Sequence, residues 1–183
     1  MEIIRKLKKL FSPKKAYYPL PKGKRNRVFI DMDGTLAEWR EGADWKAPHY
    51  YAGLSRMKQM VEAVKRLQKE GLVEVAILSH AFCKEAEEDK RKWLDKYLPG
   101  IPAIFVPYGE NKSDYVNITE RDVLVDDYSP NLLSWKGRTV KVINGVNGSH
   151  GTYKGVSVNH TWDPDIIAET ILSVAETNFE VAA

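Results

Sequence analysis

The fold is decided by the stretch Val28-Phe29-Ile30-Asp31-Met32-Asp33-Gly34-Thr35-Leu36, in which a short β-rich run ends in two carboxylates. Four further β-rich runs follow, at residues 73–78, 103–106, 122–125 and 139–143, and helical patterns occupy residues 55–70, 84–98 and 163–174. Apolar strands that alternate with helices predict an α/β fold whose parallel sheet is covered on both faces. Residues 144–162 are rich in Gly and Asn, and we expect a loop there with at most a small hairpin.

A chemically useful residue stands at the end of each of the first four strands. The first strand ends in Asp31 and Asp33, the second in Ser79 and the fourth in Asp126-Asp127, while Lys112 follows the third in a short helix. Parallel α/β sheets bind ligands in the crevice beyond the carboxyl ends of their strands. The sequence therefore predicts one site that holds four carboxylates, a hydroxyl and an ammonium.

This set of groups suits phosphoryl transfer with a divalent cation. Clustered carboxylates repel one another, and Mg²⁺ relieves that repulsion while it binds one or two of them together with a substrate phosphate. Asp31 can attack phosphorus, and Asp33 can protonate the leaving group and later deprotonate water. Gly34 permits a tight turn that exposes backbone N–H groups, and Ser79 and Lys112 can hold phosphoryl oxygens.

The same residues resemble the haloacid dehalogenase-like (HAD) phosphatases. Residues 28–36 look like their first motif, and Ser79, Lys112 and Asp126-Asp127 match the second, third and fourth motifs in order. The resemblance implies a Rossmann-like three-layer sandwich with a mainly parallel five-stranded sheet. It also implies that Mg²⁺ is held by Asp31, the Asp33 carbonyl and Asp126, with Asp127 in support.

Residues 31–39 resemble more closely the opening of the pyrimidine 5′(3′)-deoxyribonucleotidases of the cytosolic type C. That likeness implies hydrolysis of nucleoside 5′-monophosphates, with Gly34, Thr35, Trp39 and His80 as substrate-binding candidates and Trp39 stacking on the base. We expect the other aromatic residues of the insert mainly to pack. His80 could contact the phosphate or leaving group, or cap the following helix. The chain departs from the family by a very small cap insertion, residues 37–54, and by His80 and Tyr128, which stand where Pro and Arg are usual.

The charge distribution divides the chain into a basic arm, residues 1–27, and a HAD-like phosphatase domain, residues 28–183. The arm carries ten Lys or Arg against Glu2, so the rest of the chain is mildly acidic although the net charge is +3. Such an arm could contact an anionic membrane or nucleic acid, or simply remain solvated. Two alternatives to a nucleotidase follow: a phosphatase of nucleic acid ends or sugar phosphates, and a non-catalytic module targeted by the arm. A homo-oligomer is also left open.

Composition sets wider limits on the class of protein. Hydrophobic residues make up 43% and charged residues 29% of the 183 residues, which excludes a disordered or collagen-like chain. Cys83 is the sole cysteine, so no intrachain disulfide can form, and we expect it at the start of a helix without a role. No apolar run approaches the ~20 residues of a membrane span, and no secretory signal is recognisable. We therefore expect a cytoplasmic protein.

Overall fold

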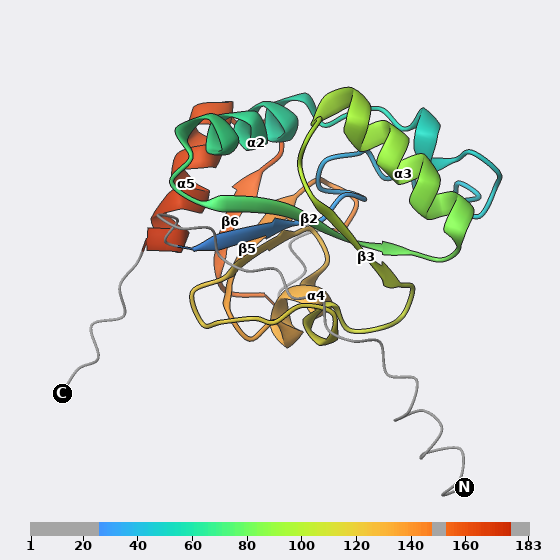
Figure 1. Ribbon diagram of the computed structural model, residues 1–183. Coiled ribbons are helices and arrows are strands. Elements are labelled where there is room, and N and C mark those ends of the chain that lie inside the picture. The colour runs from blue at the N-terminus through green and yellow to red at the C-terminus, as the bar shows by residue number, and fades with distance from the viewer. Residues whose placement is uncertain (1–25, 148–152, 177–183) are drawn as a thin grey trace, which may run out of the picture.

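The computed structural model of the chain describes residues 26–147 and 153–176, and within them six parallel strands form one sheet (Figure 1). The spatial order is β3-β2-β1-β4-β5-β6, so the chain leaves β1 in one direction and returns to its other side at β4. The strands are β1 (Arg27–Ile30), β2 (Glu74–Ala81), β3 (Ala103–Pro107), β4 (Val123–Asp126), β5 (Arg138–Ile143) and β6 (Val156–Asn159). This confirms the predicted parallel α/β fold.

Helices cover both faces of the sheet and make it the middle of three layers (Figure 1). On one face lie α2 (Lys58–Glu70), α3 (Lys84–Tyr97) and α5 (Pro164–Glu176), and on the other lies α4 (Ser129–Ser134). The alternation of β1 side chains separates two cores. Val28 and Ile30 join the cluster that contains α2, α3 and α5, whereas Phe29 joins the cluster that contains Trp135 after α4.

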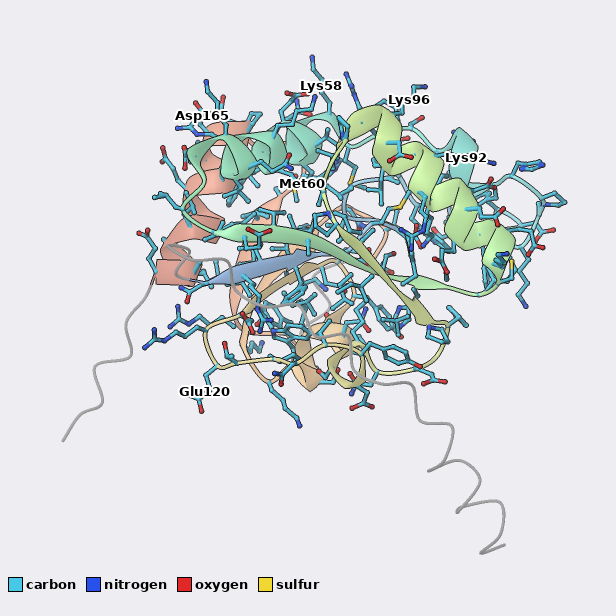
Figure 2. All side chains as sticks on the ribbon, viewed as in Figure 1. Lys58, Met60, Lys92, Lys96, Glu120 and Asp165 are labelled. Atoms are coloured by element: carbon cyan, nitrogen blue, oxygen red, sulfur yellow. The ribbon has the colours of Figure 1, made fainter. Side chains whose placement is uncertain are left out.

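The helices form where amphipathic patterns predict them, and their ends differ from the predicted ones by at most three residues. In α2 the apolar stripe faces the sheet, and Figure 2 shows Met60 between helix and sheet while Lys58 points outward. Cys83 caps α3, since its sulfur accepts a hydrogen bond from the N–H of Ala86. The short 3-10 helix η1 (Tyr51–Gly53) lies in the insert, and η2 (Lys112–Asp114) follows β3 where a short helix is expected.

The sixth strand corrects the expectation for residues 144–162. β6 pairs in parallel with β5, with Val140 opposite Val156, so the described part of this region, residues 144–147 and 153–162, adds a parallel strand in place of an antiparallel hairpin. Only Val158 of the four β6 residues is buried, because β6 is the edge strand and touches the core on one face. A segment this short with one buried apolar residue has no clear strand pattern. Helix α4 has only six residues, which is too short for an amphipathic pattern to be recognised in the sequence.

The N-terminal boundary of the sheet lies one residue earlier than the predicted domain boundary. Arg27 already belongs to β1, and its guanidinium pairs with the buried carboxylate of Asp122. Residues 1–25, which hold most of the basic arm, lie outside the described residues. Within residues 26–147 and 153–176, no helix is long and apolar enough to cross a membrane.

Candidate active site

The acidic residues meet where the strand order reverses between β1 and β4. Asp31 directly follows β1, and Asp126 is the last residue of β4. The two segments run side by side, because the N–H of Asp31 donates to the carbonyl of Val125 at 2.9 Å. This is the position at which parallel α/β sheets bind ligands, since the loops on either side of it diverge and leave a crevice.

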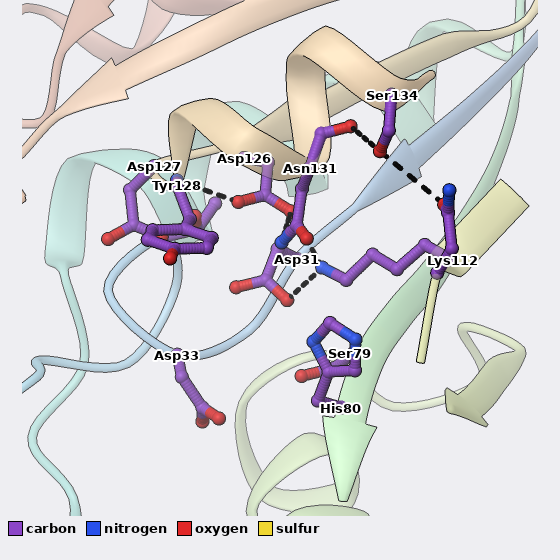
Figure 3. A network of polar contacts seen from close by, with 12 residues as sticks. Asp31, Asp33, Ser79, His80, Lys112, Asp126, Asp127, Tyr128, Asn131 and Ser134 are labelled. Atoms are coloured by element: carbon purple, nitrogen blue, oxygen red, sulfur yellow. Dashed lines mark hydrogen bonds and ion pairs between the residues drawn. The ribbon is translucent and has the colours of Figure 1, made fainter. Parts of the chain in front are cut away.

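A buried lysine joins the nucleophile candidate to the second acidic strand end. The Nζ atom of Lys112 lies 2.5 Å from Asp31 Oδ1 and 2.6 Å from Asp126 Oδ2 (Figure 3). Burial disfavours the charged ammonium, but the charges of Asp126 and Asp31 outweigh that effect, so the pKa of Lys112 lies above its ordinary value. Lys112 is therefore a fixed positive charge at the floor of the site.

Three carboxylates beside Lys112 form a candidate metal site. Asp31, Asp126 and Asp127 are buried, and each offers an oxygen within 4.8 Å of the others. Burial raises the pKa of Asp126 to about 6, with Lys112 lowering it and Asp31 raising it. Burial, Asp126 and Asp31 together raise the pKa of Asp127 to about 8. One ammonium does not balance three carboxylates, and a divalent cation would supply the missing charge.

Two asparagines that the sequence analysis did not identify fix the Asp127 carboxylate. The side-chain amide of Asn144 donates to Asp127 Oδ2 at 2.8 Å and to the carbonyl of Gly34 at 2.8 Å. The amide of Asn147 donates to the same Oδ2. The segment after β5 therefore reaches the site. The available signal was the position of Asn144 directly after a strand whose carboxyl end faces the crevice.

The first turn of the site leaves no room for a side chain at Gly34. Its φ is +77°, and a Cβ atom there would lie 2.2 Å from Asp127 Oδ2. Thr35 is fully buried beside it, and its hydroxyl lies 3.4 Å from Asp127 Oδ1. Gly34 and Thr35 thus contact the Asp127 carboxylate, and whether they also bind substrate stays a prediction.

A second buried lysine, Lys90 of α3, holds the other first-motif carboxylate. Its Nζ donates to Asp33 Oδ2, to the carbonyl of His80 at 2.6 Å and to Ser79 Oγ at 3.2 Å. Figure 3 shows the Asp33 side chain turned away from the three-carboxylate cluster. Burial raises the pKa of Asp33, although the charge of Lys90 opposes the shift.

The sequence analysis missed Lys90 because ten of the fourteen residues of α3 are charged, which favours a solvated helix. A signal was nevertheless present. Lys90 lies four residues after Ala86 and three before Trp93, on the helix stripe that faces the core.

His80 lines the cavity above the strand ends and does not cap α3. Its Nε2 lies 2.8 Å from the carbonyl oxygen of Glu110, and the cap of α3 belongs to Cys83. Burial and the positive charge of Lys112 lower the pKa of His80. Contact of His80 with the phosphate or the leaving group stays a prediction.

The cavity over these residues has a volume of about 590 Å³, with Asp31, Asp33, Asp126 and Asp127 in its lining. One wall is aromatic, and its members come from the insert and from the ends of β2 and β3: Trp39, Trp45, Tyr51, Phe82 and Tyr108. Trp45 lies between Phe82 and Tyr108, with ring centroids 5.3 and 5.0 Å away. Trp45 therefore both packs the insert against the strand ends and faces the cavity.

The opposite side of the cavity is built by the start of α4. The N–H of Tyr128 donates to Asp126 Oδ1 at 2.8 Å, and the amide of Asn131 donates to Asp126 Oδ2 at 2.9 Å. The Tyr128 ring itself is exposed at the cavity mouth. Asn131 is a further residue that the sequence analysis did not identify, because the short α4 was not predicted.

Two solved structures are similar to this chain in fold. The chain matches a HAD-like phosphatase from Mesorhizobium loti with a TM-score of 0.55 and 12% identity, covering 90% of this chain and 91% of the other. It also matches a chain in the structure of a Pnkp1/Rnl/Hen1 complex, with a TM-score of 0.52, 15% identity and 70% of this chain covered. The match covers 49% of that second protein, so the present chain spans about half its length. At these identities the likeness shows the fold alone.

The sequence comparison is more specific. No curated protein matches the sequence. Residues 44–171, however, match the family described as 5′ nucleotidase, deoxy (Pyrimidine), cytosolic type C protein, a region that includes Ser79, Lys112 and Asp126-Asp127. Asp31 and Asp33 precede the matched region, and the fold brings them to the same site. A part of the chain outside the first motif thus confirms the resemblance that the first motif indicates. The chain belongs to the NT5C family of 5′-nucleotidases.

Proposed function

We propose that the protein is a Mg²⁺-dependent phosphomonoesterase that forms an aspartyl-phosphate on Asp31 and hydrolyses nucleoside 5′-monophosphates. The observation that carries this proposal is the contact of Lys112 with Asp31 Oδ1. It leaves the second Asp31 oxygen turned away from the ammonium (Figure 3), in a residue that lines the cavity. A carboxylate fixed through one oxygen and accessible through the other is arranged as a nucleophile.

The residues of the site fit a magnesium ion. Asp31, Asp126 and Asp127 supply hard oxygen ligands, and burial together with the neighbouring carboxylates raises the pKa of the last two. The Asp33 carboxylate is engaged by Lys90, so Asp33 would contribute its main-chain carbonyl, as the family resemblance implies. Bound Mg²⁺ would neutralise phosphate charge and orient the phosphoryl group toward Asp31.

Asp31 and Asp33 would carry out the two chemical steps. The free oxygen of Asp31 attacks phosphorus while the bond from phosphorus to the ester oxygen breaks, and protonated Asp33 gives its proton to that oxygen. Asp33 next removes a proton from water, which attacks the aspartyl-phosphate and releases phosphate and the Asp31 carboxylate. Ser79 and Lys112 would hold the phosphoryl oxygens during both steps.

The aromatic wall supports a nucleotide as substrate. Trp39 lines the cavity at a ring-centroid distance of 6.5 Å from Trp45, so both rings are available beside the phosphate site. Stacking of a base on an aromatic side chain contributes about 1–3 kcal/mol. His80 also lines the cavity, with its ring centroid 6.3 Å from that of Tyr108, and would contact the phosphate or the leaving group.

The first experiment measures phosphate release from ribo- and deoxyribonucleoside monophosphates, sugar phosphates and a 3′-phosphorylated oligonucleotide, with Mg²⁺ and with EDTA. The proposal expects Mg²⁺-dependent turnover that is concentrated on the nucleoside monophosphates. Turnover only on the oligonucleotide or on sugar phosphates would retain the chemistry and refute the substrate. No turnover at all would favour a binding module, which deletion of residues 1–25 in a membrane or nucleic acid retention assay would then test.

The cytoplasmic location, a homo-oligomeric state and a role for the basic arm stay predictions.

A further inference from the structure

Lys90 differs from the other lysines of α3 because its side chain is fully buried. The fractional exposure of that side chain is 0%, against 67% for Lys92 on the same helix. A buried ammonium must be paired and hydrogen-bonded, since the loss of water is otherwise too costly. Lys90 meets this requirement in full at the active site.

The three hydrogen-bond donors of the ammonium reach three different groups. They are the carboxylate of Asp33, the carbonyl oxygen of His80 at 2.6 Å and the hydroxyl of Ser79 at 3.2 Å. The ring of Tyr51 covers the ammonium with its centroid 4.5 Å away. Lys90 therefore joins the turn after β1, the end of β2 and the insert at a single atom.

The Asp33 carboxylate is consequently held from one side only. Oδ2 binds Lys90, whereas Oδ1 is buried and has no hydrogen-bond partner among the described residues. Asp33 lines the cavity. An unpartnered buried carboxylate oxygen is costly unless a ligand completes it, which indicates that Oδ1 is kept for the substrate.

A purely structural role does not account for this geometry. A buried ion pair is weak evidence for stability, because well-packed apolar side chains of similar size often stabilise as much or more. A structural pair would also be expected to satisfy both carboxylate oxygens, as Arg27 and the backbone N–H of Thr119 do for Asp122 on the far side of the fold. Lys90 instead fixes one oxygen of Asp33 and leaves the other free.

We propose that Lys90 is a positioning residue that fixes the Asp33 carboxylate so that Oδ1 faces the leaving-group oxygen of the substrate. The inference rests on the proposed phosphatase function, in which Asp33 is the proton donor. It assigns the two buried lysines separate tasks. Lys112 fixes the nucleophile Asp31, and Lys90 fixes the acid and base Asp33.

The kinetic test compares two phosphate esters in the Lys90→Met variant. A nucleoside 5′-monophosphate has an alkoxide leaving group that needs a proton, whereas p-nitrophenyl phosphate releases a phenolate that does not. Because kcat/KM reports the steps up to leaving-group departure, we expect it to fall by about 10²-fold or more for the nucleotide. For the aryl ester we expect a much smaller fall. Equal falls for both esters would refute the proposal.

Two further variants control this comparison. Lys92→Met removes an exposed ammonium from the same helix and should leave kcat/KM unchanged for both esters. Lys90→Arg keeps the charge, but a planar guanidinium cannot make the same three contacts. It should retain the fold and show the same selective loss on the nucleotide, which decides the question if Lys90→Met does not fold. Arg substitution without any selective loss would contradict positioning by this ammonium.

A crystal structure of the variant gives a readout that does not depend on activity. In Lys90→Met or Lys90→Arg the Asp33 carboxylate should leave the orientation seen here, while Asp31 stays on Lys112. An unmoved Asp33 would overturn the inference. If the wild-type protein hydrolyses neither ester, the proposed function fails, and the crystal structures still decide whether Lys90 positions Asp33.

Discussion

Replacing Asp127 by Asn in the metal-free protein should raise the free energy of unfolding, and the gain should grow with pH. Folding buries Asp127 beside Asp126 and Asp31 and raises its pKa from 3.8 to about 8. The folded carboxyl then binds its proton more tightly than the unfolded one. Ionisation of Asp127 therefore does not destabilise the wild-type fold below about pH 4, and the destabilisation increases as the pH rises and is complete above about pH 8.

The size of the effect follows from the same shift. A tenfold change in an ionisation constant is about 1.4 kcal/mol, so a carboxyl whose pKa rises from 3.8 to about 8 destabilises the fold by about 6 kcal/mol above pH 8. For a chain of this length that corresponds to roughly 12–24 °C in Tm. Asparagine has nearly the same shape and no charge, and its side-chain oxygen can still accept from the amides of Asn144 and Asn147.

The assay is urea unfolding in EDTA at pH 5, 7 and 8.5, with Asp95→Asn, an exposed position on α3, as the control. The control should stay within about 0.5 kcal/mol of wild type at each pH. Saturating Mg²⁺ should narrow the gap between wild type and Asp127→Asn, because the ion stabilises the ionised carboxylate in the folded state. A gap that is the same at pH 5 and 8.5 would refute the argument that Asp127 lies in a crowded acidic cluster.

The remaining predictions concern turnover. Asp31→Asn should abolish phosphate release and leave the circular dichroism spectrum unchanged, since the amide cannot attack phosphorus; activity in a clean preparation would exclude the aspartyl-phosphate. Asp33→Asn should slow formation and hydrolysis of that intermediate by about 10²-fold or more, measured by single-turnover kinetics. A change in substrate affinity alone would argue against its acid and base role. Trp39→Ala should raise KM for nucleoside monophosphates by about 5- to 150-fold while p-nitrophenyl phosphate is unaffected, as expected for the loss of about 1–3 kcal/mol of base stacking. A KM that rises equally for both substrates would assign Trp39 to packing.

The central strands and the acidic strand ends could be predicted because their signals are local. Val28-Phe29-Ile30 before Asp31 and Val123-Leu124-Val125 before Asp126 are apolar runs that stop at a carboxylate, and parallel pairing brings such ends together. The register of β1 against β4 then sets Asp31 beside the end of β4. This part of the fold needed no knowledge of distant contacts.

The supporting residues could not be predicted in the same way because their roles depend on tertiary contacts. Asn144 and Asn147 act on a carboxylate about twenty residues earlier in the chain, and Lys90 acts on Asp33, 57 residues before it. In each case the local sequence favours a common alternative, a Gly- and Asn-rich loop or a charged solvated helix. β6 escaped detection because an edge strand with one buried residue carries little apolar signal.

The charge balance of the site explains why two buried lysines are needed. Asp31, Asp126 and Asp127 are buried and the Asp33 side chain is only 19% exposed, so four ionised carboxylates would crowd a small volume of low dielectric. Lys112 and Lys90 neutralise two of them in separate places, and the residual charge of about two matches a divalent cation. Without Lys112 the Asp31 carboxylate would lose the contact that fixes one of its oxygens, and without Lys90 the Asp33 carboxyl group would lose the contact that orients it. The separation of Asp31 from Asp33 is therefore achieved by the lysine that each one contacts, since the two carboxylates stand only two residues apart in the sequence.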